Sequence, residues 1–191
     1  REQQTKMPNE NTLSNENAVL LIVDVQEAFR DVIGNFAVIA SNIARAVQGF
    51  SILDVPVIVT EQYPKGLGPT AEEIKYSLAE GFEPVEKTAF SAFGAAETRI
   101  KLESLERFQI VLCGIGTHIC VNQTAHDLLH NGYRVHLLTD CVGSRFDRDK
   151  AAGLEKMRAS GVVPSSIEIA LFEMMADARH EKFKEIQQLI K

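Results

Sequence analysis

The chain has 191 residues, of which 45% are hydrophobic, and it carries a formal net charge of -6 at pH 7. This length predicts one domain with a single core, and the acidic balance argues against a general binder of nucleic acid or anionic membranes, since such binders need a basic surface. The three cysteines lack CxxC spacing, which excludes a disulfide framework or a zinc knuckle and favours a reducing, cytoplasmic setting.

Residues 1–16 are polar and contain no apolar signal-peptide core, and no stretch of the chain is long and apolar enough to predict a transmembrane helix. We therefore expect a flexible tail over residues 1–16, one domain over residues 17–191 and no membrane partner.

Apolar runs and helical periodicity alternate along the domain. A continuous apolar run that ends at Asp24 is typical of a central parallel strand. Two prolines and two glycines predict a loop over residues 61–70, and Thr70 with Glu73 resembles a capping box. Up to residue 107 the predicted elements are strand 18–24, helix 36–53, strand 56–60, a short helix after Thr70, strand 82–87 and helix 91–107.

The second half continues the alternation. Its predicted elements are strand 110–113, a helix from Thr117 to the stop at Gly132, strand 133–140, helix 148–160, a sixth strand over 166–172 that passes into a helical end, and helix 179–191. Strands alternating with helices predict an α/β fold, specifically a three-layer α/β/α sandwich around a doubly wound, mostly parallel six-stranded sheet of Rossmann-like type.

Cys120 is the most informative reactive residue. If Thr117 is the N-cap, Cys120 lies in the first helical turn, where backbone N–H groups lack intrahelical acceptors and the helix dipole favours negative charge. A thiol there tends to ionise, and a thiolate beside free N–H donors is suited to nucleophilic attack. Cys113 and Cys141 are better interpreted as small buried hydrophobic residues.

Two further reactive groups are predicted to reach the same edge of the sheet. In open α/β sheets ligands bind beyond the carboxyl ends of the strands, where Asp24, Lys87 and Cys120 all lie. A carboxylate accepts a thiol proton and an ammonium group stabilises a thiolate. Taken alone, Asp24 is equally suited to capping a turn and Lys87 to a solvated surface, so the hypothesis rests on the combination.

Three motifs together resemble the isochorismatase-like cysteine hydrolase superfamily: LLIVDVQEAF at residues 20–29, EKTAFSAF at 86–93 and GIGTHICVNQTAHDLLHNGYRV at 114–135. The resemblance implies that Cys120 is the nucleophile, Asp24 the proton acceptor and Lys87 the residue that holds both. It also implies a cis peptide between Ile115 and Gly116, and an oxyanion hole formed by the Gly116 and Cys120 amides.

The resemblance also bears on metal binding. Metal-dependent nicotinamidases of this superfamily carry an Asp-x-His element after the second strand, where this chain reads TEQYPKGLGPT. We therefore expect no metal and no cofactor. His126 and His130 have i, i+4 spacing, but they lie opposite the apolar helix face, which favours a solvated or subunit-facing role. The same segment resembles the isochorismatase-domain-containing subgroup. Some members of that subgroup carry a ribonuclease label, but the acidic net charge of this chain gives no support for ribonuclease activity.

Candidate pocket residues follow from their place near the strand ends. Phe29, Tyr63, Phe90 and Phe93 are aromatics that could wall a small substrate, with core packing an equal alternative for Phe90 and Phe93. His118 either orients substrate or is simply exposed.

The sequence therefore predicts a metal-independent cysteine hydrolase of a small amide or related carbonyl compound, acting through a thioester. The alternatives are an isochorismatase-type vinyl ether hydrolase that relies on acid catalysis by Asp24, and a catalytically silent scaffold or interaction protein. The expected partners are a small-molecule substrate and, because members of this superfamily are commonly oligomeric, further copies of the chain contacting residues 162–175 and the closing helix. No nucleic-acid partner is expected.

Overall fold

The computed structural model describes residues 11–191, and residues 1–10 of the predicted tail lie outside this range. Its centre is a six-stranded sheet in which every pairing is parallel, in the order β3-β2-β1-β4-β5-β6. The strands are β1 Ala18–Val23, β2 Val57–Gln62, β3 Val85–Lys87, β4 Gln109–Ile115, β5 Arg134–Gly143 and β6 Val163–Ser165. Strand order reverses between β1 and β4, which confirms the predicted doubly wound architecture.

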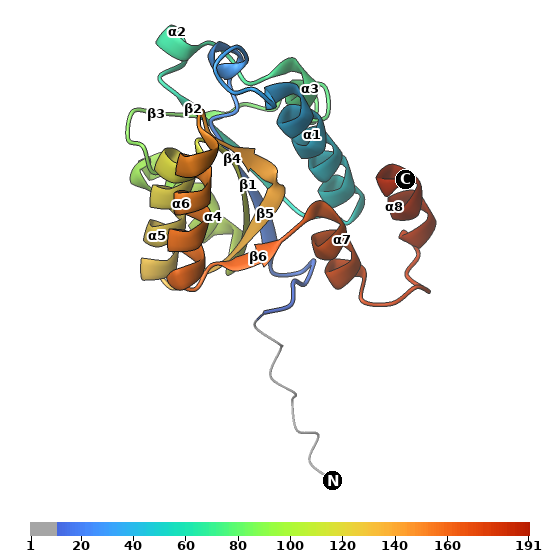
Figure 1. Cartoon of the computed structure of the whole chain (residues 1–191). Helices are drawn as coiled ribbons and strands as arrows, with labels where there is room; N and C mark the ends of the chain where they lie inside the picture. Colours follow the sequence, from blue (N-terminus) through green and yellow to red (C-terminus); the bar gives the residue numbers. More distant parts are fainter. Residues whose placement is uncertain (1–10) are drawn as a thin grey trace.

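Helices cover both faces of the sheet (Figure 1). One layer contains α4 Ala96–Leu105, α5 Asn122–His130 and α6 Asp147–Ala159, and the other contains α1 Phe36–Ile52, α3 Glu72–Lys75, α7 Ile167–Met175 and α8 Phe183–Ile190. The short helix α2, Pro64–Leu67, lies in the loop after β2. Within residues 11–191, no helix combines the length and apolar character that crossing a membrane requires.

The sequence of β1 explains why it lies at the centre. Successive strand side chains point to opposite faces, so Leu20 and Ile22 join the core beneath α1 while Leu21 and Val23 join the core beneath α5. All of β1 is buried. A continuous apolar run is therefore needed here, and the chain meets its first buried acid at Asp24, where the strand ends.

The predicted strand over residues 166–172 is wrong. The chain there forms α7, in which the Ser166 side chain accepts a hydrogen bond from the Ile169 backbone N–H at 3.2 Å. The sixth strand is the shorter Val163–Ser165. Ile167, Ala170, Leu171 and Met174 are buried at helical spacing, so the apolar run that we interpreted as a strand suits a helix equally well.

The expected capping box is also wrong. The backbone N–H and hydroxyl of Thr70 both donate to Glu61 Oε1 at 2.6 Å, and Glu73 pairs with Arg30 instead. Helix α3 begins at Glu72 without a side-chain cap. The helix predicted over residues 91–107 begins later than expected, at Ala96, after a 3-10 turn.

The predicted flexible tail extends too far into the domain. Leu13 is buried, and its backbone N–H donates to Glu173 Oε2 at 3.0 Å. The Ser14 N–H donates to Gln109 Oε1 at 2.9 Å. Contacts with the domain therefore begin before residue 17, because the apolar side chain of Leu13 packs into the core beside α7.

Candidate active site

The structure brings Asp24, Lys87 and Cys120 into one cluster at the carboxyl edge of the sheet. Asp24 follows β1 in a left-handed conformation with φ 54°, and Lys87 is the last residue of β3. Cys120 lies in the π-helical turn Thr117–Val121, hereafter the Cys120 turn, which follows β4. Lys87 Nζ lies 2.6 Å from Asp24 Oδ2, and the Cys120 thiol hydrogen-bonds to the same carboxylate. Three groups far apart in sequence thus share one buried contact.

The Lys87 ammonium group is surrounded by four hydrogen-bond acceptors. The Lys87 side chain is 0% exposed. Besides Asp24, its Nζ donates to Gln62 Oε1 at 2.7 Å and to the carbonyl oxygens of Ala89 and Phe90, each at 2.9 Å. Because an ammonium group has three protons, these four acceptors use its full donor capacity. Lys87 is therefore placed to fix and balance the charge of Asp24.

Asp24 combines burial with strong hydrogen bonds. Its second oxygen, Oδ1, accepts from the Thr60 hydroxyl at 2.7 Å. Burial raises the pKa of this carboxyl above its ordinary value, against the opposing effects of Lys87, Thr60 and the Cys120 thiol. Because burial raises its pKa and the Cys120 thiol lies next to it, this carboxylate is a suitable acceptor for the thiol proton.

Two effects in the structure oppose the expected ionisation of Cys120. Burial, followed by the negative charge of Asp24, raises the pKa of the thiol to about 12, whereas Lys87 and the Gly116 backbone N–H act in the opposite direction. The net effect favours the thiol over the thiolate. Thr117 is not the N-cap either, because Gly116 occupies that position and the Thr117 hydroxyl is buried without a partner in residues 11–191.

The backbone around the Cys120 turn has two unusual features. The peptide between Ile115 and Gly116 is cis. The turn itself is closed by a hydrogen bond from the Val121 N–H to the Gly116 carbonyl at 3.2 Å, which is the i to i−5 spacing of a π-turn. Such single turns are found at functional sites.

Helix α6 supports this turn through Gly153. A Cβ added there would lie 2.9 Å from His118 Cα and 3.1 Å from the Thr117 carbonyl oxygen. Both are backbone atoms, so the turn would have to move.

We expect Gly153→Ala to destabilise the protein by about 1–3 kcal/mol, although the same change at an open helix position stabilises it. It should also slow alkylation of Cys120 by iodoacetamide, measured by peptide mass mapping. The matched control is Gly49→Ala in α1, where the added Cβ meets only the flexible ends of two side chains, Leu171 at 2.8 Å and Leu189 at 3.3 Å. A stabilised Gly153→Ala protein with unchanged alkylation would contradict the expectation.

A cavity of about 510 Å³ opens beside the Cys120 turn. Its apolar wall consists of Ala28, Phe29, Val32, Ile33, Ile119 and Phe146, and the other lining residues are Gly116, His118, Arg145 and Asp149. Cavities of this size and largely apolar character hold small molecules. It is the candidate substrate site, because His118 and Ile119 belong to the Cys120 turn and Gly116 is its N-cap, although Cys120 itself is not among the lining residues.

The predicted pocket residues divide between this cavity and other places. Phe29 and His118 line it. Phe93 does not: it is 9% exposed and packs edge to face on Tyr133 at 6.0 Å, so its role is core packing. Phe90 is 56% exposed and is absent from the lining, although its carbonyl accepts from Lys87.

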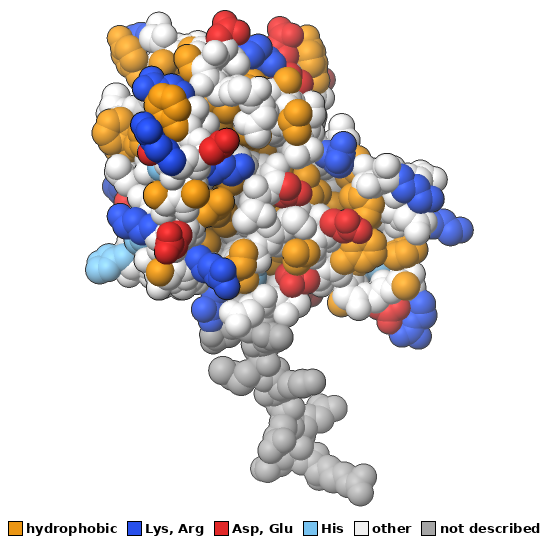
Figure 2. Space-filling view, in the orientation of Figure 1, with side chains coloured by type: hydrophobic (Ala, Val, Ile, Leu, Met, Phe, Trp, Pro, Cys, Tyr) orange, Lys and Arg blue, Asp and Glu red, His pale blue; other side chains and the backbone are white. Residues whose placement is uncertain are grey.

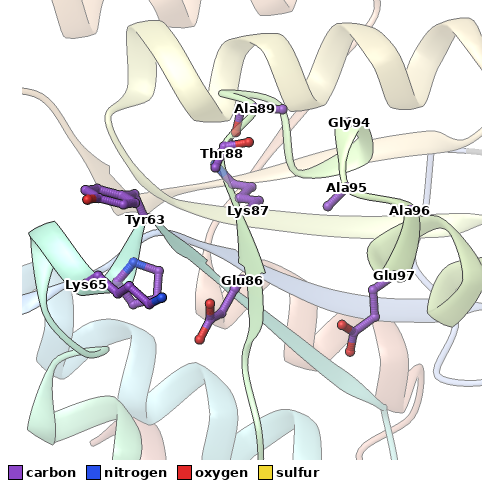
Figure 3. Close-up of a pocket in the computed structure, with 11 residues that line it drawn as sticks. Tyr63, Lys65, Glu86, Lys87, Thr88, Ala89, Gly94, Ala95, Ala96 and Glu97 are labelled. Carbon is purple, nitrogen blue, oxygen red and sulfur yellow. Dashed lines mark hydrogen bonds between the residues drawn. The ribbon is translucent and has the colours of Figure 1, made fainter.

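Tyr63 borders a different cavity, of about 440 Å³, at the outer edge of β3 (Figure 3). Lys65, Glu86 and Glu97 also surround it. None of its lining residues belongs to the Cys120 turn. Lys87 is one of the lining residues, but its ammonium is committed to its four acceptors. Tyr63 is therefore not a wall of the candidate substrate site.

Sequence reasoning missed four polar residues of the site. Thr60 and Gln62 complete the hydrogen bonds to Asp24 and Lys87, and Ser144 and Arg145 follow β5 beside the cavity. Gln62, Ser144 and Arg145 lie at or just beyond the carboxyl end of a strand, and Thr60 lies two residues before one, which is the signal that would have identified them.

No group of three or more His, Cys, Asp or Glu residues in the described chain is arranged to hold a metal ion. His126 is held between α5 and α6, with Nδ1 2.7 Å from the Asn122 carbonyl oxygen and Nε2 3.0 Å from Ser160 Oγ. His130 is exposed at the end of α5. Within residues 11–191, both ring nitrogens of His126 therefore have hydrogen-bond partners, which His130 does not share.

Comparison with solved structures places the fold. The MAR1 ribonuclease of Caenorhabditis elegans has a TM-score of 0.89 and 36% sequence identity, and the match covers 94% of this chain and 92% of that one. The YcaC gene product of Escherichia coli, with a TM-score of 0.80, 18% identity and 94% of each chain covered, shares the fold alone.

Sequence comparison defines the family. Isochorismatase domain-containing protein 2 of Danio rerio is 44% identical over 179 residues, which cover 93% of this chain and 89% of that protein. The Homo sapiens protein of the same name is 41% identical over 175 residues, which cover 92% and 83%. Residues 18–169 match the isochorismatase domain. This chain therefore belongs to the isochorismatase family, and its membership in that family supports hydrolase activity.

Proposed function

We propose that this protein is a cysteine-nucleophile hydrolase of a small amide or related carbonyl compound, which acts through a thioester and needs no metal ion. The single observation that carries the proposal is the buried contact of Asp24 with both the Lys87 ammonium and the Cys120 thiol. The 510 Å³ cavity beside the Cys120 turn supplies room for the substrate.

The first half of the reaction follows from the protonated state of the sulfur. Because burial and Asp24 hold the thiol proton, attack on the carbonyl carbon is coupled to transfer of that proton to Asp24. The backbone N–H groups of Gly116 and Cys120 stabilise the tetrahedral oxyanion. The C–N bond then breaks as Asp24 returns the proton to the departing amine, which leaves an acyl group on the sulfur.

The second half uses the same carboxylate. Asp24 takes a proton from water, the oxygen attacks the thioester carbonyl, and the sulfur leaves and recovers its proton from Asp24. Lys87 and Thr60 keep the carboxylate in one position through both halves. The site therefore needs one acid–base group, used four times.

Arg145 narrows the choice of substrates to test. Its guanidinium lies 4.7 Å from the Phe146 ring centroid and forms no ion pair with residues 11–191. An unpaired guanidinium on a mostly apolar cavity is suited to a carboxylate. The first panel should therefore contain small amides with and without a carboxylate group.

The test has three readouts. Iodoacetamide with peptide mass mapping should label Cys120 far faster than the fully buried Cys113 and Cys141. Ammonia or amine release should appear with at least one member of the amide panel, unchanged by a chelator. Acid quenching during turnover should trap an acyl adduct on the peptide that contains Cys120. Equally slow labelling of all three cysteines would instead favour a catalytically silent scaffold.

A vinyl ether hydrolase is the second candidate, because burial raises the pKa of Asp24 and acid catalysis needs a protonated carboxyl group. This reaction uses the acid and does not need the sulfur. Vinyl ether cleavage that persists in Cys120→Ala would select it over the amide hydrolase.

RNA belongs among the test substrates, because the Caenorhabditis elegans structural relative is described as a ribonuclease. We expect no cleavage, since the chain has a net charge of -6 and basic side chains are interspersed with acidic ones on the face in Figure 2. We also propose a homo-oligomer in the cytoplasm. The Escherichia coli YcaC protein is an octameric hydrolase of the same fold, and light scattering of the purified protein would measure the assembly.

A further inference from the structure

His118 lines the 510 Å³ cavity but has no part in the reaction described so far. It lies two residues before Cys120. Its ring atoms Cε1 and Nδ1 both lie 3.5 Å from the place where a Cβ on Gly116 would stand. The imidazole therefore lies against the glycine whose N–H is the proposed oxyanion donor.

The hydrogen bond of His118 to Ser144 determines which ring nitrogen carries the proton. Nδ1 lies 2.9 Å from Ser144 Oγ, and Ser144 is buried. In residues 11–191 the Ser144 hydroxyl has no other acceptor for its proton. If Nδ1 donated to the hydroxyl, that buried proton would be left without a partner, which is costly. An arrangement in which the hydroxyl donates to Nδ1 satisfies that proton and places the ring proton on Nε2.

This tautomer leaves His118 with a hydrogen-bond donor to use. Nε2 makes no hydrogen bond within the described chain. We propose that His118 is a specificity-determining residue whose Nε2–H donates to a carbonyl or carboxylate oxygen on the acyl part of the substrate, with Ser144 setting the tautomer. The proposal rests on the proposed function, because it needs Cys120 to be the atom that attacks.

Two alkylating agents separate recognition of an oxygen acceptor from reactivity of the sulfur. With iodoacetamide or iodomethane, the sulfur forms a bond to carbon, iodide leaves and the thiol proton passes to Asp24. Both reactions depend equally on the sulfur, but only iodoacetamide carries a carbonyl oxygen. The ratio of the two rate constants at Cys120 therefore reports recognition of the oxygen.

We expect His118→Phe to lower the iodoacetamide to iodomethane ratio about five- to tenfold, the usual effect of one lost hydrogen bond. His118→Gln, which retains an N–H donor at a similar reach, should recover most of the ratio. The matched control His130→Phe, at the exposed end of α5, should leave both rate constants unchanged. Ser144→Ala keeps the imidazole but lets its proton lie on either ring nitrogen. The ratio of rate constants in this variant should therefore fall about twofold.

The outcomes distinguish failure of the inference from failure of the proposed function. An unchanged ratio in His118→Phe, with Cys120 still labelled far faster than the other cysteines, would overturn the inference and leave the hydrolase proposal intact. If neither agent labels wild-type Cys120 preferentially, both the inference about His118 and the proposed function are overturned. Should His118→Phe not fold, an unchanged ratio in His118→Asn, which can reach Ser144 but places no donor at the Nε2 position, would overturn the inference instead.

Discussion

Asp24→Asn is expected to stop hydrolysis while making the Cys120 sulfur easier to ionise. The variant lacks the group that accepts the thiol proton, a function worth about 10²- to 10⁴-fold in rate. It also lacks the negative charge that, after burial, does most to raise the pKa of the thiol, whereas the Lys87 ammonium remains. Turnover and thiolate formation should therefore change in opposite directions.

The measurement is the pH dependence of Cys120 alkylation by iodoacetamide alongside hydrolysis of the best amide. The wild-type thiol, with its pKa near 12, should be labelled increasingly fast as the pH rises toward that value. Asp24→Asn should reach its maximum at lower pH. A midpoint at or above that of the wild type would contradict the assigned charge coupling, and full hydrolysis by the variant would exclude Asp24 as the base.

Cys120→Ala completes the comparison. It should reduce hydrolysis to the uncatalysed background, because no thioester can form without the sulfur. The matched control is Cys141→Ala, which removes another buried thiol from a position in the core and should retain activity. Hydrolysis that survived Cys120→Ala would rule out covalent catalysis.

Lys87→Met is expected to lower the free energy of unfolding by about 3–5 kcal/mol at pH 8, because removal of one partner leaves a buried charge uncompensated. The Asp24–Lys87 contact is almost completely buried, with the two side chains 1% and 0% exposed. The matched control is Lys101→Met. Lys101 pairs with Glu97 at 3.3 Å on the exposed surface, so this variant should change stability by less than about 0.5 kcal/mol.

The loss in Lys87→Met should depend on pH. Without the ammonium, burial raises the pKa of Asp24 further above its unfolded value of 3.8, so the folded variant binds a proton that the unfolded chain releases. Stability contributed by that proton is present at low pH and is lost as the pH rises through the folded pKa. Urea unfolding at pH 5 and pH 8 should show the larger deficit at pH 8. Equal deficits would show that Asp24 keeps its charge unaided.

Local sequence was sufficient for the architecture and for the place of the three reactive residues. The apolar run of β1 can only be buried on both faces of a parallel sheet, and its end at Asp24 therefore lies at the carboxyl edge. The same reasoning applies to Lys87 at the end of β3 and to Cys120 after β4. These inferences need only the order of strands and turns, which the hydrophobic periodicity and the positions of the glycines indicate.

Where two periodicities fit equally well, the sequence was not sufficient. The run from Ile167 to Phe172 is apolar enough for a strand or a helix, and packing against α1 and α8 decided for the helix. Phe29 and Phe93 are both aromatics near strand ends, yet one lines the cavity and the other packs on Tyr133. Such outcomes depend on which surfaces meet, and no local pattern records that.

The protonation of the site was decided by tertiary structure alone. The sequence placed Cys120 in a first helical turn and so predicted a lowered thiol pKa, but burial and the adjacent Asp24 raise that pKa instead. Gln62, Thr60 and Ser144 entered the site for the same reason, through contacts between separate strands. The sequence by itself determined which groups arrive at the edge of the sheet. Their protonation states depend on burial and on neighbouring charges, and both are set only when the chain folds.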